Sequence, residues 1–178
     1  MSAFPILMYD TDIGLGYGGK ARFVNYLSRK ESFDFIVFNS TKGERWYVFT
    51  FSIPDVEIRQ GKKYSFSFDL KAEYDKYLKY SFYGIGKDSA KGDETLFVSE
   101  TKELQLRLGR GFNPHFVLEA HYTLRNVRYF GIEENKPFTE TLEEVGEQFS
   151  PFASFVIRYD TSNSQIHPTR GFRLIFQN

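Results

Sequence analysis

Residues 64–73, YSFSFDLKAE, decide the fold, because apolar and polar residues alternate along them with a period of two. Every even position is apolar and every odd position is polar. A β-strand directs successive side chains to opposite faces, so this stretch predicts a strand with one apolar and one polar face. The function then depends on which of these two faces points into the folded protein.

The same alternation recurs along most of the chain. Apolar residues occupy alternate positions in residues 47–53, 104–108, 116–124 and 155–159. Turns rich in glycine, proline and polar residues separate such segments. They lie at residues 41–44, 60–62 and 111–114.

These patterns predict an all-β, antiparallel architecture of about eight strands. The strands are expected near residues 12–26, 32–41, 45–54, 62–73, 77–86, 95–110, 113–130 and 152–162, with a further short strand at 168–177. Two polar stretches, residues 87–94 and 131–151, are expected to form surface loops. The second loop is expected to contain a short helical turn with Leu142, Val145 and Phe149 on one side.

Composition limits the classes of function. The 178 residues suffice for one domain, residues 1–178, and no linker divides them. Lys plus Arg and Asp plus Glu both number 23, so the net charge is zero, whereas a nucleic-acid-binding protein normally carries a basic excess. We therefore expect no nucleic-acid partner. The chain has no cysteine, which excludes disulfides, thiolate metal sites and a cysteine nucleophile.

Residues that usually carry catalysis are scattered. The histidines His115, His121 and His167 do not have the spacing of a metal site. Glu119 and His121 lie on the polar face of one predicted strand, where a structural carboxylate–imidazole hydrogen bond is expected. We expect no catalytic residue, no metal and no cofactor, and hence no enzymatic activity. A barrel enzyme acting on envelope lipid, with His121 as its best candidate, is the weaker alternative.

Strand length and the position of charges favour a transmembrane β-barrel. Many predicted strands have about ten residues or more, which suits the ~9–11 tilted residues that cross a bilayer. The polar face carries charges in mid-strand, and aromatic residues recur near strand ends, as in the aromatic girdles of membrane barrels. These charges are Asp69, Lys71, Glu119, Arg125 and Arg158, and the girdle candidates are Tyr74, Tyr77, Phe112, Tyr129, Phe130 and Phe152. The alternative is a soluble or periplasmic β-barrel that turns its apolar face inward and binds an apolar ligand.

Residues 12–21, DIGLGYGGKA, match two nucleotide-binding patterns by spacing, a phosphate loop and a dinucleotide fingerprint. Alanine stands where a phosphate loop needs serine or threonine, and no strand–helix–strand unit follows, so no nucleotide cofactor is expected. As a strand, the segment has one bare face, which suits a close approach of another element or a barrel seam. The candidate seam strand therefore contains Gly14, Gly16, Gly18 and Gly19.

Three segments carry a family resemblance. Residues 4–23 combine a proline, aromatic residues and a Gly-x-Gly run, and residues 82–97, FYGIGKDSAKGDETLF, place Gly-x-Gly before a polar loop. Residues 158–174, RYDTSNSQIHPTRGFRL, hold the most specific motif. These segments resemble the outer-membrane surface-antigen superfamily, the BamA/TamA-like barrels, with residues 4–23 as the first barrel strand. In the third segment Tyr159, Asp160, Thr161, Pro168, Thr169 and Gly171 match the family pattern, whereas Ser162 replaces its customary arginine.

The resemblance implies a sixteen-strand barrel of the bacterial outer membrane that inserts other barrel proteins or translocates polypeptide. It implies a weak seam between the first and last strands, where an incoming strand is templated. The implied partners are the lipid bilayer and unfolded outer-membrane protein clients. The resemblance also assigns lumen or hairpin positions to Tyr159, Asp160, Pro168, Arg170 and Gly171, with an ion pair expected between Asp160 and Arg170.

Two parts of such family members are not found in this sequence, the periplasmic POTRA modules and the second barrel half with its Val-Arg-Gly-Phe/Tyr loop. The chain is therefore expected to form a small barrel or half of a sixteen-strand barrel. Unpaired strand edges are unfavourable in lipid. We therefore expect the sheet to close, either within one chain or through a partner such as a second copy.

Overall fold

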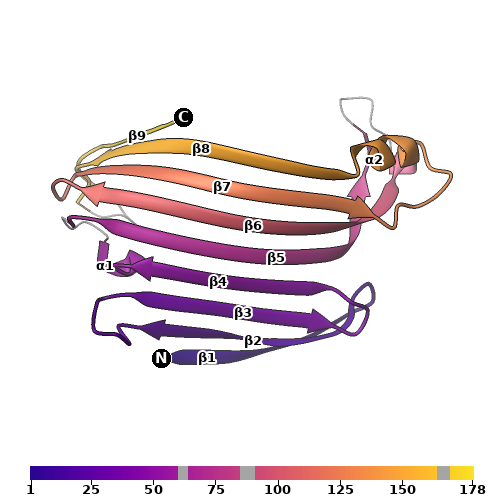
Figure 1. Cartoon of the computed structure of the whole chain (residues 1–178), viewed down its shortest axis with the longest axis horizontal. Coiled ribbons are helices and arrows are strands. Elements are labelled where there is room, and N and C mark those ends of the chain that lie inside the picture. Colours follow the sequence, from indigo (N-terminus) through magenta and orange to yellow (C-terminus); the bar gives the residue numbers. More distant parts are fainter. Residues whose placement is uncertain (60–63, 85–90, 164–168) are drawn as a thin grey trace.

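The computed structural model describes residues 1–59, 64–84, 91–163 and 169–178. These residues form one nine-stranded antiparallel sheet in which each strand pairs with the next along the chain (Figure 1). The strands are β1 (Ser2–Asp10), β2 (Gly14–Val24), β3 (Ser32–Ser40), β4 (Arg45–Ile53), β5 (Ser67–Phe82), β6 (Thr95–Gly111), β7 (Phe116–Phe130), β8 (Glu147–Asp160) and β9 (Arg173–Gln177). Short helices are α1 (Val56–Arg59), the 3-10 helix η1 (Lys91–Asp93) and α2 (Thr139–Val145). No helix in these four ranges is long and apolar enough to span a bilayer.

The all-β antiparallel prediction is confirmed, but the strand boundaries differ in three places. The predicted strands 62–73 and 77–86 are joined in β5, because residues 74–76 remain extended and paired with β6; residues 62–63 and 85–86 lie outside the described residues. β1 does not stand among the strands predicted from the alternation; the resemblance placed residues 4–23 in one first strand, and the structure divides them into β1 and β2. β8 begins at Glu147 and so takes up the end of the predicted loop 131–151. The predicted helical turn in that loop is confirmed in part as α2, which contains Leu142 and Val145 and is capped by Gly146, whereas Phe149 lies in β8.

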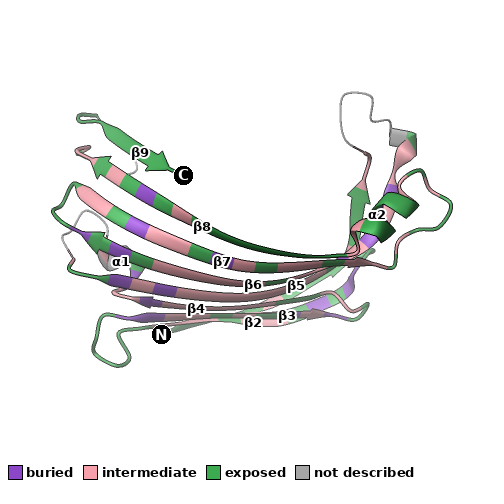
Figure 2. Ribbon diagram, turned by 45° about the horizontal axis from the view of Figure 1, so that its top comes forward, coloured by how far each residue is buried: buried purple, intermediate pink, exposed green. Residues whose placement is uncertain are grey.

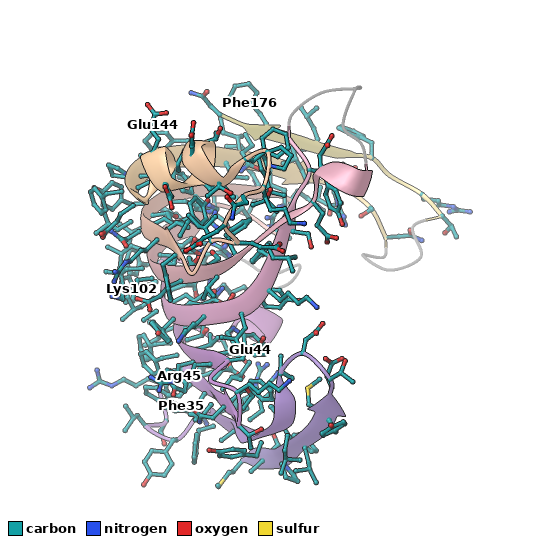
Figure 3. The ribbon with its side chains drawn as sticks, turned by 90° about the vertical axis from the view of Figure 1, so that its right-hand side faces the viewer. Phe35, Glu44, Arg45, Lys102, Glu144 and Phe176 are labelled. Atoms are coloured by element: carbon teal, nitrogen blue, oxygen red, sulfur yellow. The ribbon has the colours of Figure 1, made fainter. Side chains whose placement is uncertain are left out.

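The register places apolar side chains on one face of the sheet and polar side chains on the other. One apolar row runs across β3 to β7 as Phe35, Phe49, Ala72, Leu104 and Leu124. A polar row runs across β4 to β8 as Ser52, Asp69, Arg107, His121 and Ser154. The sheet is bent into a trough (Figure 2). Phe35 and Lys102 lie on its convex side (Figure 3).

The apolar face is therefore the outer face, as in a membrane barrel. A soluble barrel that binds an apolar ligand would turn its apolar face inward, so this alternative is not the observed arrangement. An aromatic girdle faces the lipid, but three of the six predicted girdle residues do not lie on the outer face. Tyr77, Tyr129 and Phe152 lie on the inner face, because they pair with Ser99 or Thr123.

The sheet does not close within the described residues, since no pairing joins β1 to β9. The two strands lie at opposite edges (Figure 1). Of the two predicted routes to closure, closure within one chain is therefore not observed in the described residues. The curvature of the sheet is too gentle to bring nine strands into a cylinder, as expected for the wall of a wider barrel. Closure through a partner stays a prediction.

A polar network ties together the strand ends near α1. Asp55 is 2% exposed and accepts hydrogen bonds from Arg22 Nη2 at 2.9 Å and Ser32 Oγ at 3.0 Å. Arg59 Nη1 of α1 donates to Asp69 Oδ2 at 2.8 Å. These contacts hold α1 against the inner face of the sheet.

The loop between β2 and β3 folds around a single carboxylate. Glu31 is 1% exposed, and its side chain accepts hydrogen bonds from the backbone N–H of Leu27 at 2.5 Å and of Arg29 at 2.9 Å. The left-handed residues Asn25 and Lys30 (φ 54° and 62°) allow the chain to turn around it. The hydrogen bond from Leu27, followed by others from this loop, lowers the pKa of Glu31 below its ordinary value.

We expect this loop to loosen in acid. A carboxyl group with a lowered folded-state pKa stabilises the fold above its unfolded pKa, and this contribution is lost as the pH falls through the folded pKa. Hydrogen-exchange protection of residues 25–31 should therefore decrease below the ordinary glutamate pKa of ~4.3. Glu31→Gln should show low protection at every pH. Glu134→Gln, in an exposed loop at the other end of the sheet, should behave as the unmodified chain; an unchanged profile in Glu31→Gln would contradict the assignment.

Candidate functional site at the sheet edges and inner face

The sheet exposes two strand edges. β1 pairs with β2 on one side only, and its other side has no partner among the described residues. On the far side of the sheet, β9 pairs with β8 only over residues 156–160 of β8. Residues 147–154 of β8 therefore present a second edge without a strand partner in the described ranges. Such edges are templates for pairing with another strand.

The four candidate seam glycines lie in β2, not in the first strand. The expectation for residues 4–23 is wrong in this respect, because the segment forms a hairpin of β1 and β2 around a turn at residues 11–13. Gly16 and Gly18 lie on the inner face, and Gly19 lies on the outer face opposite Pro5. Gly14 begins the strand with φ +74°.

The glycines on the inner face are required by neighbours on β3. A Cβ atom on Gly16 would lie 2.5 Å from the ring of Phe38, which is 7% exposed. A Cβ atom on Gly18 would lie 2.0 Å from the carbonyl oxygen of Val37. The absence of side chains at Gly16 and Gly18 thus leaves room for the ring of Phe38 and for the backbone of β3 at Val37.

The same glycines weaken the attachment of β1. Ile6 and Met8 are paired with Gly18 and Gly16, so they have no side chain directly opposite on β2. Cross-strand side-chain pairs contribute much of the stability of a sheet. Inner-face residues of β1 are therefore held to β2 largely by backbone hydrogen bonds.

Two prolines mark the edge strands, a signal that the sequence analysis missed. Pro5 lies in β1 and Pro151 lies in β8 within the stretch without a second partner strand. Proline lacks an N–H group and is confined in sheets to edges, strand starts and bulges. An apolar segment that contains proline, such as residues 2–10, can be recognised as an edge strand on this basis.

The β8–β9 hairpin holds the family-motif residues. Asp160 Oδ2 accepts a hydrogen bond from Arg173 Nε at 2.6 Å, and Asp160 Oδ1 accepts one from the backbone N–H of Ser162 at 2.9 Å. The expected partner was Arg170, but the described side-chain pair is with Arg173, which lies directly opposite in the register. The hydroxyl of Ser162, at the position of the customary arginine, also donates to Asp160.

The remaining motif residues shape this hairpin. Gly171 has φ +91°, and a Cβ atom there would lie 2.3 Å from the carbonyl oxygen of Thr161. The ring of Tyr159 packs against Phe172, with centroids 5.6 Å apart. Pro168 lies outside the described residues, as does His167.

The five mid-strand charges predicted for the polar face each have a charged or imidazole partner. Glu119 Oε2 lies 3.2 Å from His121 Nε2 and 3.9 Å from Arg158 Nη2, which confirms the expected carboxylate–imidazole contact. Arg125 Nε lies 3.6 Å from Glu103 Oε2. Further pairs on this face join Lys71 to Glu73 and Asp69 to Arg59. Within the described ranges, no three His, Asp or Glu side chains are grouped so as to hold a metal ion.

The inner face also contains a polar hollow of about 380 Å³. Acidic side chains and Arg125 line one part of it, and aromatic residues line the other. A bulge between Tyr77 and Tyr80 brings Tyr80 onto this face, where its ring stacks on Phe97 at 5.7 Å. The arrangement is a wet channel wall with paired charges, which is the chemistry expected of a barrel lumen.

Comparisons with known proteins agree with this geometry. The family model described as the Omp85 superfamily domain matches residues 25–178. The crystal structure of BamA from Haemophilus ducreyi lacking POTRA domains 1–3 has a similar fold, with a TM-score of 0.55 and 14% sequence identity. The match covers 98% of this chain and 32% of that chain, so this chain spans about a third of its length. No curated protein matches the sequence.

Gly18→Ala should destabilise the sheet, whereas Gly19→Ala should not. The new methyl group at position 18 would meet the backbone of β3 at 2.0 Å, but at position 19 the nearest atom is the carbonyl oxygen of Phe4 at 3.4 Å. We expect Gly18→Ala to lower the free energy of unfolding by about 1–3 kcal/mol. Gly19→Ala should leave it unchanged or raise it by up to about 1 kcal/mol. Urea titrations in detergent, followed by gel mobility of unheated samples, measure both; equal stability of the two variants would contradict the packing described for Gly18.

Arg173→Ala should loosen β9, whereas Arg170→Ala should not. Of the two arginines, Arg173 is the one with a described hydrogen bond to Asp160, and this pair is partly exposed, so its loss should reduce local stability by about 1 kcal/mol. Hydrogen exchange of the β8–β9 amides measures this effect. A larger loss of protection in Arg170→Ala than in Arg173→Ala would restore the pairing expected from the sequence.

Proposed function

This chain belongs to the Omp85 superfamily, and from that premise we propose that it forms part of the wall of a bacterial outer-membrane β-barrel. We propose that this barrel inserts other outer-membrane proteins or translocates polypeptide. The apolar convex face supports contact with lipid, and the paired charges of the concave face support a hydrated lumen. No residue in this proposal has a catalytic role; His121 serves as a structural partner of Glu119.

The open edge of β1 is the observation that carries the proposal. Each unpaired backbone group in hydrocarbon costs several kcal/mol, so a strand edge within the membrane needs a partner. An extended segment of a client protein can supply this partner by adding itself to the sheet. The further strands of a longer barrel or a second copy of this chain would cover the same edge when no client is present.

The backbone of β1 offers hydrogen bonds to such a strand. In an antiparallel strand, alternate residues direct both N–H and C=O to the same side. Pro5 has no N–H group, and its position in β1 places the odd-numbered residues with their polar groups toward the open edge. Leu7 is therefore a donor and an acceptor at this edge, and its side chain is 75% exposed.

The weak attachment of β1 supports a role as the movable side of a seam. Near the turn, its inner-face neighbours on β2 are the glycines Gly14, Gly16 and Gly18, so few cross-strand side-chain pairs are lost there when β1 shifts. The seam that the sequence analysis placed in the glycine strand is accordingly proposed for β1, with Gly14, Gly16, Gly18 and Gly19 behind it. The edge at residues 147–154 of β8 is proposed as the other side.

Leu7→Pro tests this function directly. The substitution removes the N–H group at the open edge without removing a hydrogen bond between β1 and β2. We expect the purified chain, reconstituted in phospholipid vesicles, to accelerate the folding of a urea-denatured outer-membrane barrel protein. Leu7→Pro should reduce that rate about tenfold, the equivalent of about 1.4 kcal/mol for an edge hydrogen bond lost in a dry environment.

Leu7→Ala is the matched control, because it truncates the side chain and keeps the N–H group. It should retain the full rate. A rate for Leu7→Pro equal to that of Leu7→Ala would reject the edge as the working site. Replacing Leu7 by a photo-cross-linking phenylalanine derivative identifies the neighbour: an adduct with the client supports templating, and an adduct of two chains without client supports closure by a second copy.

A further inference from the structure

The outer face contains a shallow apolar groove of about 570 Å³. It runs across β3 to β7 and reaches Phe149 of β8, and its apolar lining includes Phe35, Phe49, Ala72, Leu104 and Leu124. Its volume falls within the ~300–1,000 Å³ range of ligand sites in proteins. The groove lies on the face that the proposed function turns toward lipid, and the inference below rests on that function.

A single small residue forms the hollow. Ala72 lies between Phe49 on β4 and Leu104 on β6 in one cross-strand row. The side chain of Ala72 is much smaller than those of Phe49 and Leu104, so the outer surface has a depression at β5. Large side chains on both sides then form walls about one strand spacing away, ~4.8 Å.

A cluster of cations lies at one end of the groove. Lys102 lines the groove, and its side chain is 63% exposed. The next row of outer-face residues toward α2 is charged from β4 to β8, namely Arg45, Lys76, Glu100, Arg128 and Glu147, and continues on β3 with the neutral Asn39. Arg45 and Lys102 lie on the same convex side of the sheet (Figure 3).

The contacts within this cluster leave an excess of positive charge. Lys102 Nζ lies 3.2 Å from Glu100 Oε1, and Glu147 Oε1 accepts a hydrogen bond from Asn126 Nδ2 at 2.9 Å. Lys76 and Arg128 both lie over the ring of Phe130, at 5.6 and 5.4 Å from its centroid. The cluster therefore contains four cations and two carboxylates, a net charge of +2 at one level of the sheet. The cations are Arg45, Lys76, Lys102 and Arg128, and the carboxylates are those of Glu100 and Glu147.

We propose that the groove holds one acyl chain of a membrane lipid whose anionic phosphate headgroup contacts Lys102 and the neighbouring cations. The charged row interrupts the apolar face across β4 to β8, so phosphate groups of the bilayer lie beside it. Leu104 follows Lys102 by two residues, about 7 Å along the strand, which carries an acyl chain from the headgroup directly into the hollow over Ala72. The site therefore combines an apolar hollow for an acyl chain with positive charges at one end for the headgroup.

Native mass spectrometry of the full chain, released from detergent micelles that contain phosphatidylglycerol, tests this site. The unmodified chain should retain one phosphatidylglycerol with higher affinity than phosphatidylcholine, which carries no net charge. Ala72→Phe fills the hollow and should weaken retention of both lipids at least about tenfold. Ala153→Phe, an equal substitution on the outer face of β8 away from the groove, should change neither affinity.

Lys102→Gln separates the headgroup from the acyl chain. It should weaken phosphatidylglycerol about threefold to tenfold and leave phosphatidylcholine unchanged, because one charge-assisted contact is lost. Lys136→Gln, in the loop before α2, is the charge control and should have no effect. Two results would overturn the inference: equal phosphatidylglycerol retention in Ala72→Phe and Ala153→Phe, or loss of the headgroup preference when inorganic phosphate is added, which would indicate a cation cluster that binds free phosphate only.

These outcomes are distinct from failure of the proposed function. If phosphatidylglycerol is not retained but Leu7→Pro still slows client folding, only the lipid site is wrong. If the chain retains neither lipid and its gel mobility does not depend on heating, the membrane-barrel function itself is wrong.

Discussion

A β-strand in hydrocarbon must satisfy its backbone polar groups by pairing, because no water is present to replace a missing neighbour. The sheet described here obeys this rule between β1 and β8, where every strand has a neighbour on each side over most of its length. Within the described residues, one side of β1, residues 147–154 of β8 and the outer side of β9 have no strand partner. The sheet is therefore continuous but not closed into a barrel. The proposed activity depends on its unpaired strand edges.

The second requirement is that charges on the inner face have partners. Burial of an isolated charge is strongly unfavourable, whereas a paired charge with access to water is tolerated. The contacts of Glu119 with His121 and Arg158, and of Arg125 with Glu103, show how a neutral chain can carry many charges on one face. The zero net charge of the sequence is thus compatible with a strongly polar lumen rather than with an inert surface.

The alternation in residues 64–73 was sufficient to predict the fold class and the two faces, since side-chain direction in a strand depends only on residue parity. Other features depend on neighbours that are distant in sequence. Gly18 is needed because of the backbone of Val37, and Asp160 meets Arg173 rather than Arg170 because of strand register. The division of residues 4–23 into β1 and β2 depends on their pairing as a hairpin, although Pro5 in β1 is a local sign of an edge strand. The lipid groove depends on the alignment of Ala72 with Phe49 and Leu104 across three strands, which no single segment reveals.

The bare inner face of β2 also affects how firmly the register of β1 is defined. Strands rich in glycine specify their register weakly, because sliding a neighbour past them changes few side-chain contacts. A slip of two residues would keep Leu7 on the outer face and move Met8 from beside one glycine to beside another. The β1 edge can thus meet incoming strands of different stagger without unfolding the hairpin. The same β1 edge could then pair with strands of different length and sequence.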